Sequence, residues 1–406
     1  VTLFIKGSIC HTFRLSPMKR SSLPISSSSS SALNLRLISL DAFVFRCPSP
    51  VPVRTSFGIM RDRPAVFVKA ESADGHIGWG EIWCNFPSCG AEHRAQLLNT
   101  VIAPLLLNKD FSHPSSAFEE ASTKTHVLAL QSGELGPMAQ VIAGVDIALW
   151  DLCARRAKLP LYQLLGGSNA RIGVYASGIN PDASLQTVQK KYQEGFRAFK
   201  LKIGFDTELD IANVRSVREW LDPALELMAD VNQAWDLAKA LENIAKLEPY
   251  GLSWLEEPLR CDREMRQWQE LKEHSRIPLA AGENMLGLAN FMSAIESKAF
   301  DVLQPDIAKW GGISASWAVI QNALSQGLRY CPHYLGAGIG LMASAHLLAA
   351  SGGDGLLEVD ANENPLRTML APGLQKIDNG FITLTQDPGL GVEPDLDALS
   401  VACQQN

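Results

Sequence analysis

The sequence predicts an α/β protein in which a (β/α)8-type barrel, a modified TIM barrel, follows an α+β capping domain. From about residue 171, short apolar runs recur, and most of them precede a stretch with helical periodicity. Ionisable residues near the ends of successive runs are spaced 23 to 28 residues apart, which suits a strand, a helix and two short loops. Eight such units in series predict the barrel, and the runs are 172–178, 198–204, 225–232, 252–258, 278–284, 300–306, 328–333 and 355–360.

The segment before the barrel places strands ahead of helices, which is typical of an α+β unit. Residues 35–46 and 64–70 are rich in Val, Phe, Leu and Ile and predict two strands. Between them, residues 47–63 are flanked and interrupted by prolines, so we expect a long loop with a functional role. A turn at 73–75 predicts a hairpin into IGWGEIW. Apolar spacing predicts three helices, at about 91–107, 114–132 and 137–157.

These patterns divide the chain into a leader, a capping domain, a barrel and a C-terminal segment that returns to the capping domain. Their expected ranges, in that order, are 1–33, 34–160, 161–375 and 376–406. The leader carries four basic residues, no acidic residue and six consecutive serines. We expect a disordered extension that takes no part in the fold, with an organelle-targeting segment as the alternative.

Composition limits the classes of function. The 406 residues are 46% hydrophobic and 19% charged, which is typical of a globular chain. A net charge of −7 offers no basic field for nucleic acid, and no apolar run approaches the ~18 residues of a membrane span. We expect neither partner, and a cytoplasmic location unless the leader directs import into an organelle. The eight cysteines form no CxxC pair, so we expect free thiols in a reducing compartment.

Seven of the eight runs end near an ionisable residue, and in a barrel the strand C-termini face one side, where active sites lie. Converging carboxylates repel one another unless a cation lies among them. The successive carboxylates Asp230, Glu256 and Glu283 therefore predict a hard oxygen site that suits Mg²⁺. The seven residues are Lys202, Asp230, Glu256, Glu283, Asp306, His333 and Glu358.

Candidate bases flank the three carboxylates. Lys200 and Lys202 are separated by one residue on a strand, so their side chains face the same way. We expect two ammonium groups beside a divalent cation to lower each other's pKa, which would make one lysine a general base. Of the eight histidines, His333 alone lies at the end of a predicted barrel strand. Asp306, one strand earlier, is placed to hold its imidazole by a hydrogen bond.

Seven short motifs resemble, in order and spacing, those of the mandelate racemase subgroup of the enolase superfamily. They are KLKIG, ADVN, WLEEP, AGEN, QPD followed by KWGG, CPH and LEVD. The resemblance runs from residue 34 to the end. It implies Mg²⁺-dependent removal of the proton next to a carboxylate, giving an enediolate, and a symmetric homo-oligomer. It further implies metal ligation by Asp230, Glu256 and Glu283, acid–base catalysis by Lys202 and His333, tuning by Lys200, orientation by Asp306, and substrate contacts by Glu358 and Asn232.

Asp306 distinguishes between subgroups. In chains that resemble muconate cycloisomerases, a catalytic lysine ends the sixth strand and no histidine follows on the seventh. Here Asp306 holds that position and His333 follows, while Lys309 is the lysine beside the double glycine of both subgroups. The resemblance therefore disfavours a two-lysine cycloisomerase or dipeptide epimerase, and Glu283 as third ligand agrees.

Two outcomes of the enediolate stay open for a small-molecule carboxylate substrate. We favour dehydration of a polyhydroxy (sugar) acid, because such dehydratases are numerous in this subgroup; the alternative enzyme is a racemase or epimerase of a 2-hydroxy acid. Arg54, Arg61 and Arg63 in the predicted loop suit a distal hydroxyl or carboxylate. A non-catalytic binding barrel is the remaining alternative, and the intact set of ligands and bases argues against it.

Two further features are interpreted as structural. Glu257 follows Glu256, and strand alternation points its side chain away from the predicted metal. Gly336, Gly338 and Gly340 spell GxGxG after the seventh strand, where tight packing explains them better than phosphate binding does.

Overall fold

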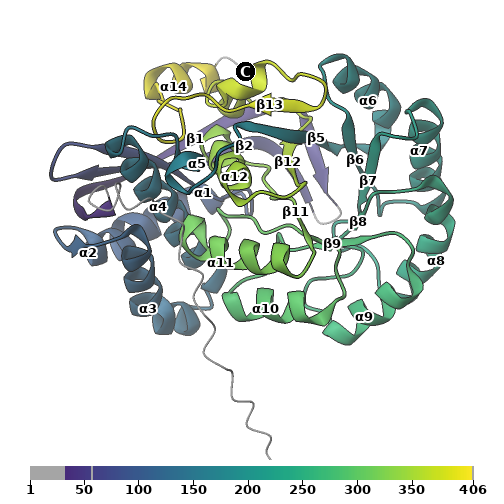
Figure 1. Cartoon of the computed structure of the whole chain (residues 1–406), viewed down its shortest axis with the longest axis horizontal. Coiled ribbons are helices and arrows are strands. Elements are labelled where there is room, and N and C mark those ends of the chain that lie inside the picture. Colours follow the sequence, from purple (N-terminus) through teal and green to yellow (C-terminus); the bar gives the residue numbers. More distant parts are fainter. Residues whose placement is uncertain (1–32, 56–57, 405–406) are drawn as a thin grey trace, which may run out of the picture.

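The computed structural model describes residues 33–55 and 58–404, so nearly all of the expected leader lies outside the described residues. It confirms the predicted fold class. Parallel strands form a nearly closed barrel, and an antiparallel sheet with its own helices lies beside it (Figure 1).

Each predicted barrel run contains one strand of the parallel sheet. The strands pair in chain order from β5 to β11, and β12 pairs with β5, which brings the last strand beside the first. The strands are β5 (Arg171–Ile179), β6 (Ala198–Lys202), β7 (Glu226–Asp230), β8 (Leu255–Glu256), β9 (Leu279–Ala281), β10 (Val302–Leu303), β11 (Arg329–Tyr330) and β12 (Leu356–Asp360).

Helices follow these strands and surround the barrel (Figure 1). Their apolar faces pack inward, as the predicted periodicity requires. They are α6 (Ser184–Gln193), α7 (Thr207–Trp220), α8 (Leu237–Leu247), α9 (Met265–His274), α10 (Leu288–Ser297), α11 (Gly312–Ser325) and α12 (Gly338–Ser351), with short 3₁₀ turns at Pro181–Ala183 and Glu248–Tyr250.

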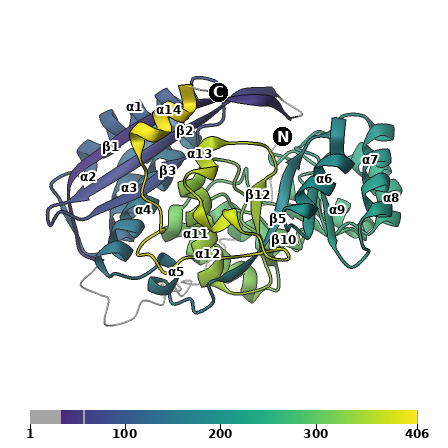
Figure 2. The same ribbon diagram turned by 90° about the horizontal axis from the view of Figure 1, so that it is seen from above.

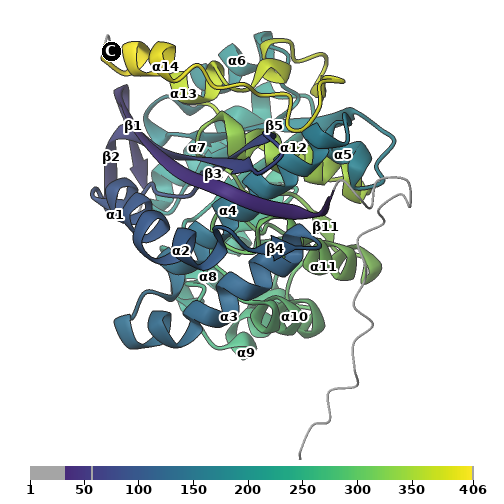
Figure 3. The same ribbon diagram turned by 90° about the vertical axis from the view of Figure 1, so that its left-hand side faces the viewer.

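The capping unit consists of one antiparallel sheet and several helices, which Figure 3 shows in front of the barrel. The strand order in the sheet is β3-β2-β1-β4. The strands are β1 (Leu35–Thr55), β2 (Gly58–Ser72), β3 (Ile77–Ile82) and β4 (Asp110–Phe111). The helices are α1 (Gly90–Leu97), a π-helical turn (Leu98–Ile102), α2 (Ala103–Leu106), α3 (Pro114–Ser132), α4 (Leu135–Arg156) and the short α5 (Leu161–Leu164).

The long loop expected at 47–63 is wrong, because β1 and β2 both continue through it. Cys47 pairs with Arg63, and after an irregular stretch Val53 pairs with Met60. The three prolines of this part of β1 fall at or within that irregular stretch, where the lost backbone N–H breaks no regular ladder. The result is an arm of two strands that extends from the capping sheet toward the barrel (Figure 2).

Helix α4 is long and apolar enough to cross a membrane by length and composition, contrary to the expectation that no run approaches that length. However, 89% of its apolar window is buried, because α4 lies between β3 and α11. A Cβ at Gly78 or Gly80 of β3 would overlap the backbone of α4, so these glycines permit the close approach. By its burial, α4 is a core helix.

The C-terminal segment runs back across both units. It contains α13 (Pro365–Thr368), a 3₁₀ turn (Pro372–Gln375), β13 (Phe381–Thr383), which pairs with β5, and α14 (Leu396–Gln404), which packs on β1 (Figure 2). Cys403 of α14 forms a disulfide with Cys47 of β1, so the expectation of free thiols is wrong for this pair. The two positions lie 356 residues apart, and spacing along the sequence could not connect them.

Two buried carboxylates of the capping unit bind backbone groups of the barrel. Asp146 of α4 accepts hydrogen bonds from Ile313 N at 2.8 Å and Ser314 N at 2.9 Å, at the start of α11. Glu81 of β3 accepts from Ala337 N at 2.6 Å and Gly340 N at 2.9 Å, at the start of α12. Each carboxylate therefore fixes the first turn of a barrel helix.

The GxGxG stretch is packed against this second contact. A Cβ at Gly336 or Gly340 would overlap the hydroxyl of Tyr334, and one at Gly336 would also press on Glu81. These glycines therefore allow close packing, as the structural interpretation expects.

We expect Asp146→Ala to lower the free energy of unfolding by about 3 kcal/mol, because it leaves two buried N–H groups and the Ser314 hydroxyl without their acceptor. Asp236→Ala is the control, because Asp236 caps α8 at the surface by accepting from Lys239 N and should cost about 1 kcal/mol. Urea unfolding followed by circular dichroism measures both. Equal losses would contradict a special role for Asp146 in joining the two units.

Candidate active site

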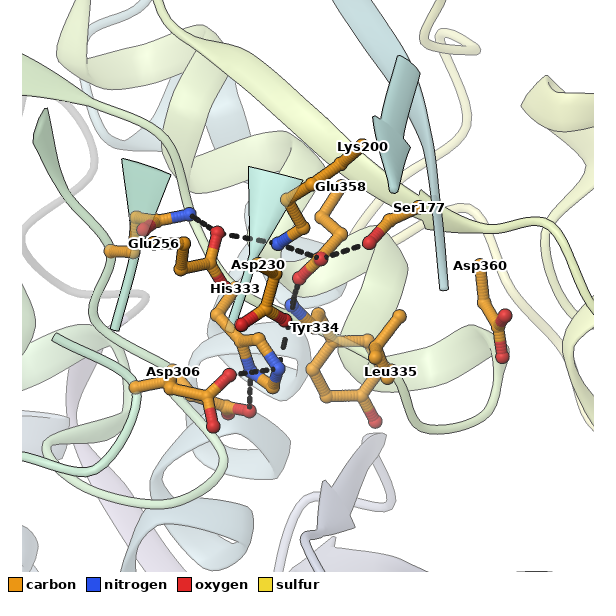
Figure 4. Close-up of polar contacts among 12 residues, drawn as sticks. Ser177, Lys200, Asp230, Glu256, Asp306, His333, Tyr334, Leu335, Glu358 and Asp360 are labelled. Atoms are coloured by element: carbon orange, nitrogen blue, oxygen red, sulfur yellow. Dashed lines mark hydrogen bonds and ion pairs between the residues drawn. The ribbon is translucent and has the colours of Figure 1, made fainter. Parts of the chain in front are cut away.

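The ionisable residues predicted at the strand ends lie together at the carboxyl end of the barrel, and all are buried. Strand alternation places Lys200 and Lys202 of β6 on the same side, facing the carboxylates of neighbouring strands. Figure 4 shows Lys200 between Glu256 and Glu358. Its Nζ lies 2.6 Å from Glu256 Oε2 and 2.7 Å from Glu358 Oε1. Lys200 thus pairs with two carboxylates, and its single charge offsets one of their two negative charges.

Lys202 has its own partners one strand away. Its Nζ donates to Asp230 Oδ2 at 2.6 Å and to Asn232 Oδ1 at 2.6 Å. The Asn232 backbone N–H also donates to Asp230 Oδ1 at 2.7 Å, so the turn after β7 holds this carboxylate in place. Lys202, Asp230 and Asn232 form one hydrogen-bonded unit at the cavity wall.

The expected lowering of the lysine pKa applies beside a divalent cation; without that ion, the neighbouring carboxylates determine the direction of the shift. Burial favours the neutral amine and Lys200 repels the charge of Lys202, but the carboxylate of Asp230 outweighs both and raises the pKa of Lys202. The pKa of Lys200 is raised well above its ordinary value, because Glu256 and Glu358 outweigh the effect of burial. The sequence argument included the like-charged neighbour and omitted these direct carboxylate partners.

His333 follows β11 and lies between two carboxylates. Its Nδ1 is 2.8 Å from Asp306 Oδ2, and its Nε2 is 2.7 Å from Glu283 Oε2. Burial disfavours the imidazolium, but Glu283, Glu358 and the Asp306 hydrogen bond raise the pKa of His333 well above its usual range. Backbone N–H groups of Ala308 and Lys309 bind the other oxygen of Asp306. The structure thus brings His333 and Asp306 together, and the two backbone N–H groups hold the Asp306 carboxylate in position.

Glu358, predicted to contact the substrate, is held by hydrogen bonds from two neighbouring groups. Ser177 Oγ donates to its Oε1 at 2.6 Å, and the Tyr334 backbone N–H donates to its Oε2 at 2.9 Å (Figure 4). Burial raises the pKa of Glu358, but Lys200 and His333 dominate and lower it to about 2. In this arrangement Glu358 faces the cationic groups Lys200 and His333. Sequence reasoning missed Ser177 and the Tyr334 N–H, which carry no ionisable signal.

The three predicted metal ligands fit a hard divalent cation in their chemistry. Glu256 Oε1 is buried and accepts no hydrogen bond from the residues that the structure describes. Burial, together with Asp230, Glu358 and Glu283, raises the pKa of Glu256 to about 7 despite Lys200. A cation beside this free oxygen would relieve the repulsion among the carboxylates.

The carboxylates are nevertheless turned toward cationic side chains. Within 33–55 and 58–404, no three acidic, His or Cys side chains stand in ligand geometry as they are. Asp230 points to Lys202, and Glu283 points to His333 and, at 3.4 Å, to Lys309. Metal binding therefore requires Asp230 and Glu283 to exchange these partners for the ion.

Next to the third ligand lies a polar cluster that the sequence did not predict. Asn284 Nδ2 donates to Glu257 Oε2 at 2.9 Å and to Glu283 Oε1 at 2.8 Å. Lys309 Nζ donates to Asn284 Oδ1 at 3.1 Å and lies 4.8 Å from the ring of Trp83. Glu257 is thus joined to Glu283 through Asn284, beside the predicted metal ligands. A polar side chain directly after a predicted ligand, as in GEN, is the signal that could have indicated Asn284.

A cavity of about 310 Å³ opens above these groups. The predicted substrate residues Arg63 and Asn232 line it, whereas Arg61 is exposed and does not. The Arg54 side chain lies outside the described part of the structure. The capping unit supplies one wall of the cavity and the barrel loops supply the rest: the lining is Met60, Arg63, Trp83, Asn85, Phe86, Gly178, Lys202, Asn232, Gln233, Glu283, Asn284, Lys309, His333, Leu335, Asp360 and Asn362.

Comparison with known proteins agrees with this geometry. A model of enolase C-terminal domain-like sequences matches residues 183–398, and a model of the mandelate racemase/muconate lactonizing enzyme N-terminal domain matches residues 39–166. The chain therefore belongs to the mandelate racemase/muconate lactonizing enzyme family. The resemblance inferred from the strand-end motifs is confirmed.

Relatives in the mandelate racemase/muconate lactonizing enzyme family cover most of the chain. A mandelate racemase/muconate lactonizing enzyme from Bordetella bronchiseptica is 54% identical, with a TM-score of 0.87 over 91% of this chain and 100% of that one. Arabinonate dehydratase from Saccharolobus solfataricus is 30% identical over 80% of this chain and 87% of its own length. An enolase from Bradyrhizobium, solved with magnesium and mandelic acid, is 28% identical, with a TM-score of 0.80 over 91% and 98% of the chains.

We expect Glu256→Gln to weaken Mg²⁺ binding by at least about 100-fold, because it removes one charge from a three-carboxylate site, and losing groups outside the ligand shell already costs 10–100-fold. Glu257→Gln is the matched control: it makes the same change one residue away, outside the proposed ligand set, and should weaken binding by about tenfold, the lower end of that range. Titration calorimetry with Mg²⁺ measures both. Equal affinity of Glu256→Gln and the unaltered protein would refute the ligand assignment.

Proposed function

We propose that this enzyme dehydrates a polyhydroxy acid by Mg²⁺-dependent removal of the proton next to the carboxylate. The observation that carries the proposal is that Lys202 and His333 line one cavity beside three converging carboxylates, and that Asp306 binds the far side of the His333 ring. One basic group and one protonated acid in the same cavity are what an elimination of water needs.

The first step of the reaction, removal of the α-proton, needs a metal ion and a base. Magnesium held by Asp230, Glu256 and Glu283 would draw electron density from the substrate carboxylate and acidify the neighbouring C–H. With Asp230 engaged by the ion, the Lys202 ammonium would lose its proton to water, and the neutral amine would then accept the substrate proton at Nζ.

The departing hydroxyl needs a proton, and His333 supplies it. The imidazolium is protonated on Nε2, which faces the cavity side of the ring beside Glu283. Transfer of this proton to the hydroxyl breaks the carbon–oxygen bond and releases water. Asp306 keeps the Nδ1 proton and holds the ring through transfer, and the capping residues Trp83 and Phe86 restrict access of water.

Racemisation or epimerisation of a 2-hydroxy acid is the second candidate, and the same pair of residues favours it. If Lys202 and His333 approach the substrate from different faces, one removes the proton and the other returns it. A substrate without a hydroxyl on the β-carbon would leave only this course.

Incubation of the Mg²⁺-loaded enzyme in D₂O with sugar acids and 2-hydroxy acids separates the candidates. Loss of the α-proton signal in NMR with release of a 2-keto acid supports dehydration. Exchange with inversion and no keto product assigns racemisation instead. No exchange with any acid would leave a binding barrel as the function.

Loss of either acid–base group should stop turnover. We expect Lys202→Ala and His333→Asn to lower kcat by about 100-fold or more, the scale of general acid–base catalysis. For a dehydratase, His333→Asn should retain α-proton exchange, because only the departing hydroxyl lacks its acid. Lys246→Ala and His274→Asn change exposed residues on α8 and α9 and serve as controls. Wild-type turnover by both site variants would refute the pairing.

The His333–Asp306 pair predicts a shift in pH dependence. Asp306→Asn keeps the shape of the side chain and removes the charge, so the pKa of His333 falls and its acid form survives only at lower pH. The alkaline limb of the kcat/KM profile should move down by about one to three pH units. Asp301→Asn, at the opposite end of β10, should leave the profile in place. An Asp306→Asn profile that overlays wild type would reject the pair, whatever the loss of stability.

A further inference from the structure

The two oxygens of the Glu256 carboxylate lie in opposite environments. Oε2 accepts three hydrogen bonds, from Lys200 Nζ at 2.6 Å, from Gln304 Nε2 at 2.7 Å and from Trp254 Nε1 at 3.3 Å. Oε1 is buried and accepts none from the residues that the structure describes. All four residues are at most 1% exposed. The carboxylate is therefore held by one oxygen, and the other oxygen is left for a further partner.

The three donors reach this oxygen from different parts of the barrel. Lys200 lies on β6 and Gln304 directly after β10, and β8 with Glu256 lies between these two strands in the sheet. Trp254 precedes Glu256 by two residues, so its indole leaves the backbone on the same side. A Cβ at Gly282 would lie 2.7 Å from the backbone of Gln304, so this glycine permits the end of β9 to approach it. The position of Oε2 thus depends on several strands and not on a local turn.

Gln304 has no part in the proposed acid–base chemistry. It is absent from the cavity lining, and its Oε1 accepts no hydrogen bond within the described part of the chain. Turning the amide over would place this oxygen against the carboxylate of Glu256, where two acceptors repel each other, so Nε2 faces Glu256. Burial of an amide with an unpaired oxygen is costly. The hydrogen bond that its side chain does make is to a predicted metal ligand.

The other two predicted ligands have no such free oxygen. Asp230 accepts hydrogen bonds on both of its carboxylate oxygens. Each oxygen of Glu283 likewise has a nitrogen of a neighbouring side chain within 2.8 Å. Both ligands must therefore exchange partners before they bind an ion. Glu256 is the ligand that is already in position, and it offers an ion a single oxygen because its other oxygen is enclosed by donors.

We propose that Gln304, together with Lys200 and Trp254, restricts Glu256 to binding an ion through one oxygen and thereby selects Mg²⁺ over Ca²⁺. The inference rests on the metal ion of the proposed function, and Gln304 is a positioning residue outside the ligand set. Mg²⁺ demands a near-octahedral shell and keeps several waters, whereas Ca²⁺ takes more oxygens and accepts a carboxylate through both of them. A carboxylate with one enclosed oxygen does not supply that two-oxygen contact, so the site favours the smaller ion.

Calorimetric titration with Mg²⁺ and with Ca²⁺ tests the inference, and the ratio of the two association constants is the readout. Gln304→Met keeps the length of the side chain and removes the donor, so it should weaken Mg²⁺ binding by about tenfold. Ca²⁺ binding should weaken less, because Oε2 of Glu256 is then more accessible, so the ratio of Mg²⁺ to Ca²⁺ affinity is lowered. Trp254→Phe removes a longer hydrogen bond and should lower the ratio less. An unchanged or raised ratio in Gln304→Met would overturn the inference, and Trp254→Phe decides in the same way if the first variant does not fold.

Gln140→Met and Trp268→Phe are matched controls, because they make the same changes at buried residues outside the cavity lining. Gln140 accepts a hydrogen bond from Arg94 Nε at 2.9 Å, and its loss should lower stability and leave both ion affinities unchanged. A merely structural role of Gln304 would weaken the binding of both ions by the same factor, together with a lower Tm. Circular dichroism shows whether each variant is folded.

Failure of this inference differs from failure of the proposed function. If the unaltered protein binds neither ion, the metal-dependent function and the inference are both rejected. If it binds Mg²⁺ and the ratio does not move in the variants, the inference alone is rejected. If the ratio is lowered as expected while no acid exchanges its α-proton in D₂O, the inference is upheld and the proposed reaction is rejected.

Discussion

Five carboxyl groups meet at the carboxyl end of the barrel, where little water can stabilise their charges; they are Asp230, Glu256, Glu283, Asp306 and Glu358. Cationic side chains of the same chain form ion pairs with these carboxylates. Lys202 pairs with Asp230, and Lys200 pairs with Glu256 and Glu358. His333 lies between Glu283 and Asp306. The proposed catalytic groups are thereby held in place by ion pairs that offset part of the cost of burying their charges. Each pair also restrains its partner, so a bound divalent cation would change the pKa of Lys202 by taking over Asp230.

The capping unit controls the site through buried charges as well as through its cavity wall. Asp146 and Glu81 fix the first turns of α11 and α12, which begin directly after the loops that carry Asp306 and His333. Arg63 reaches the end of β12. The barrel strands thus supply the reacting groups, while the position of the cap determines how they stand relative to the substrate. Variation in the cap can alter the substrate without disturbing the chemistry.

The sequence predicted the features that depend on local pattern. All eight barrel strands and the ionisable residues at their ends follow from periodicity, because side-chain alternation forces those residues to converge. Features that depend on distant contacts escaped it. The disulfide from Cys47 to Cys403 joins positions that only the return of α14 brings together. The continuation of β1 through its prolines depends on pairing with β2. The pKa of Lys202 depends on a carboxylate that spacing alone could not orient toward it.

The charges along the cavity also give it a direction. At the catalytic end, the five carboxylates face four cations, Lys200, Lys202, His333 and Lys309, so the balance is negative and favours a metal ion. At the other end, Asp360 pairs with Arg63 and Arg367, and Glu194 also attracts Arg367, so cations and anions alternate there. A substrate carboxylate is therefore favoured at the catalytic end only after a cation has offset the excess negative charge there, so binding of the ion has to come first or together with the acid.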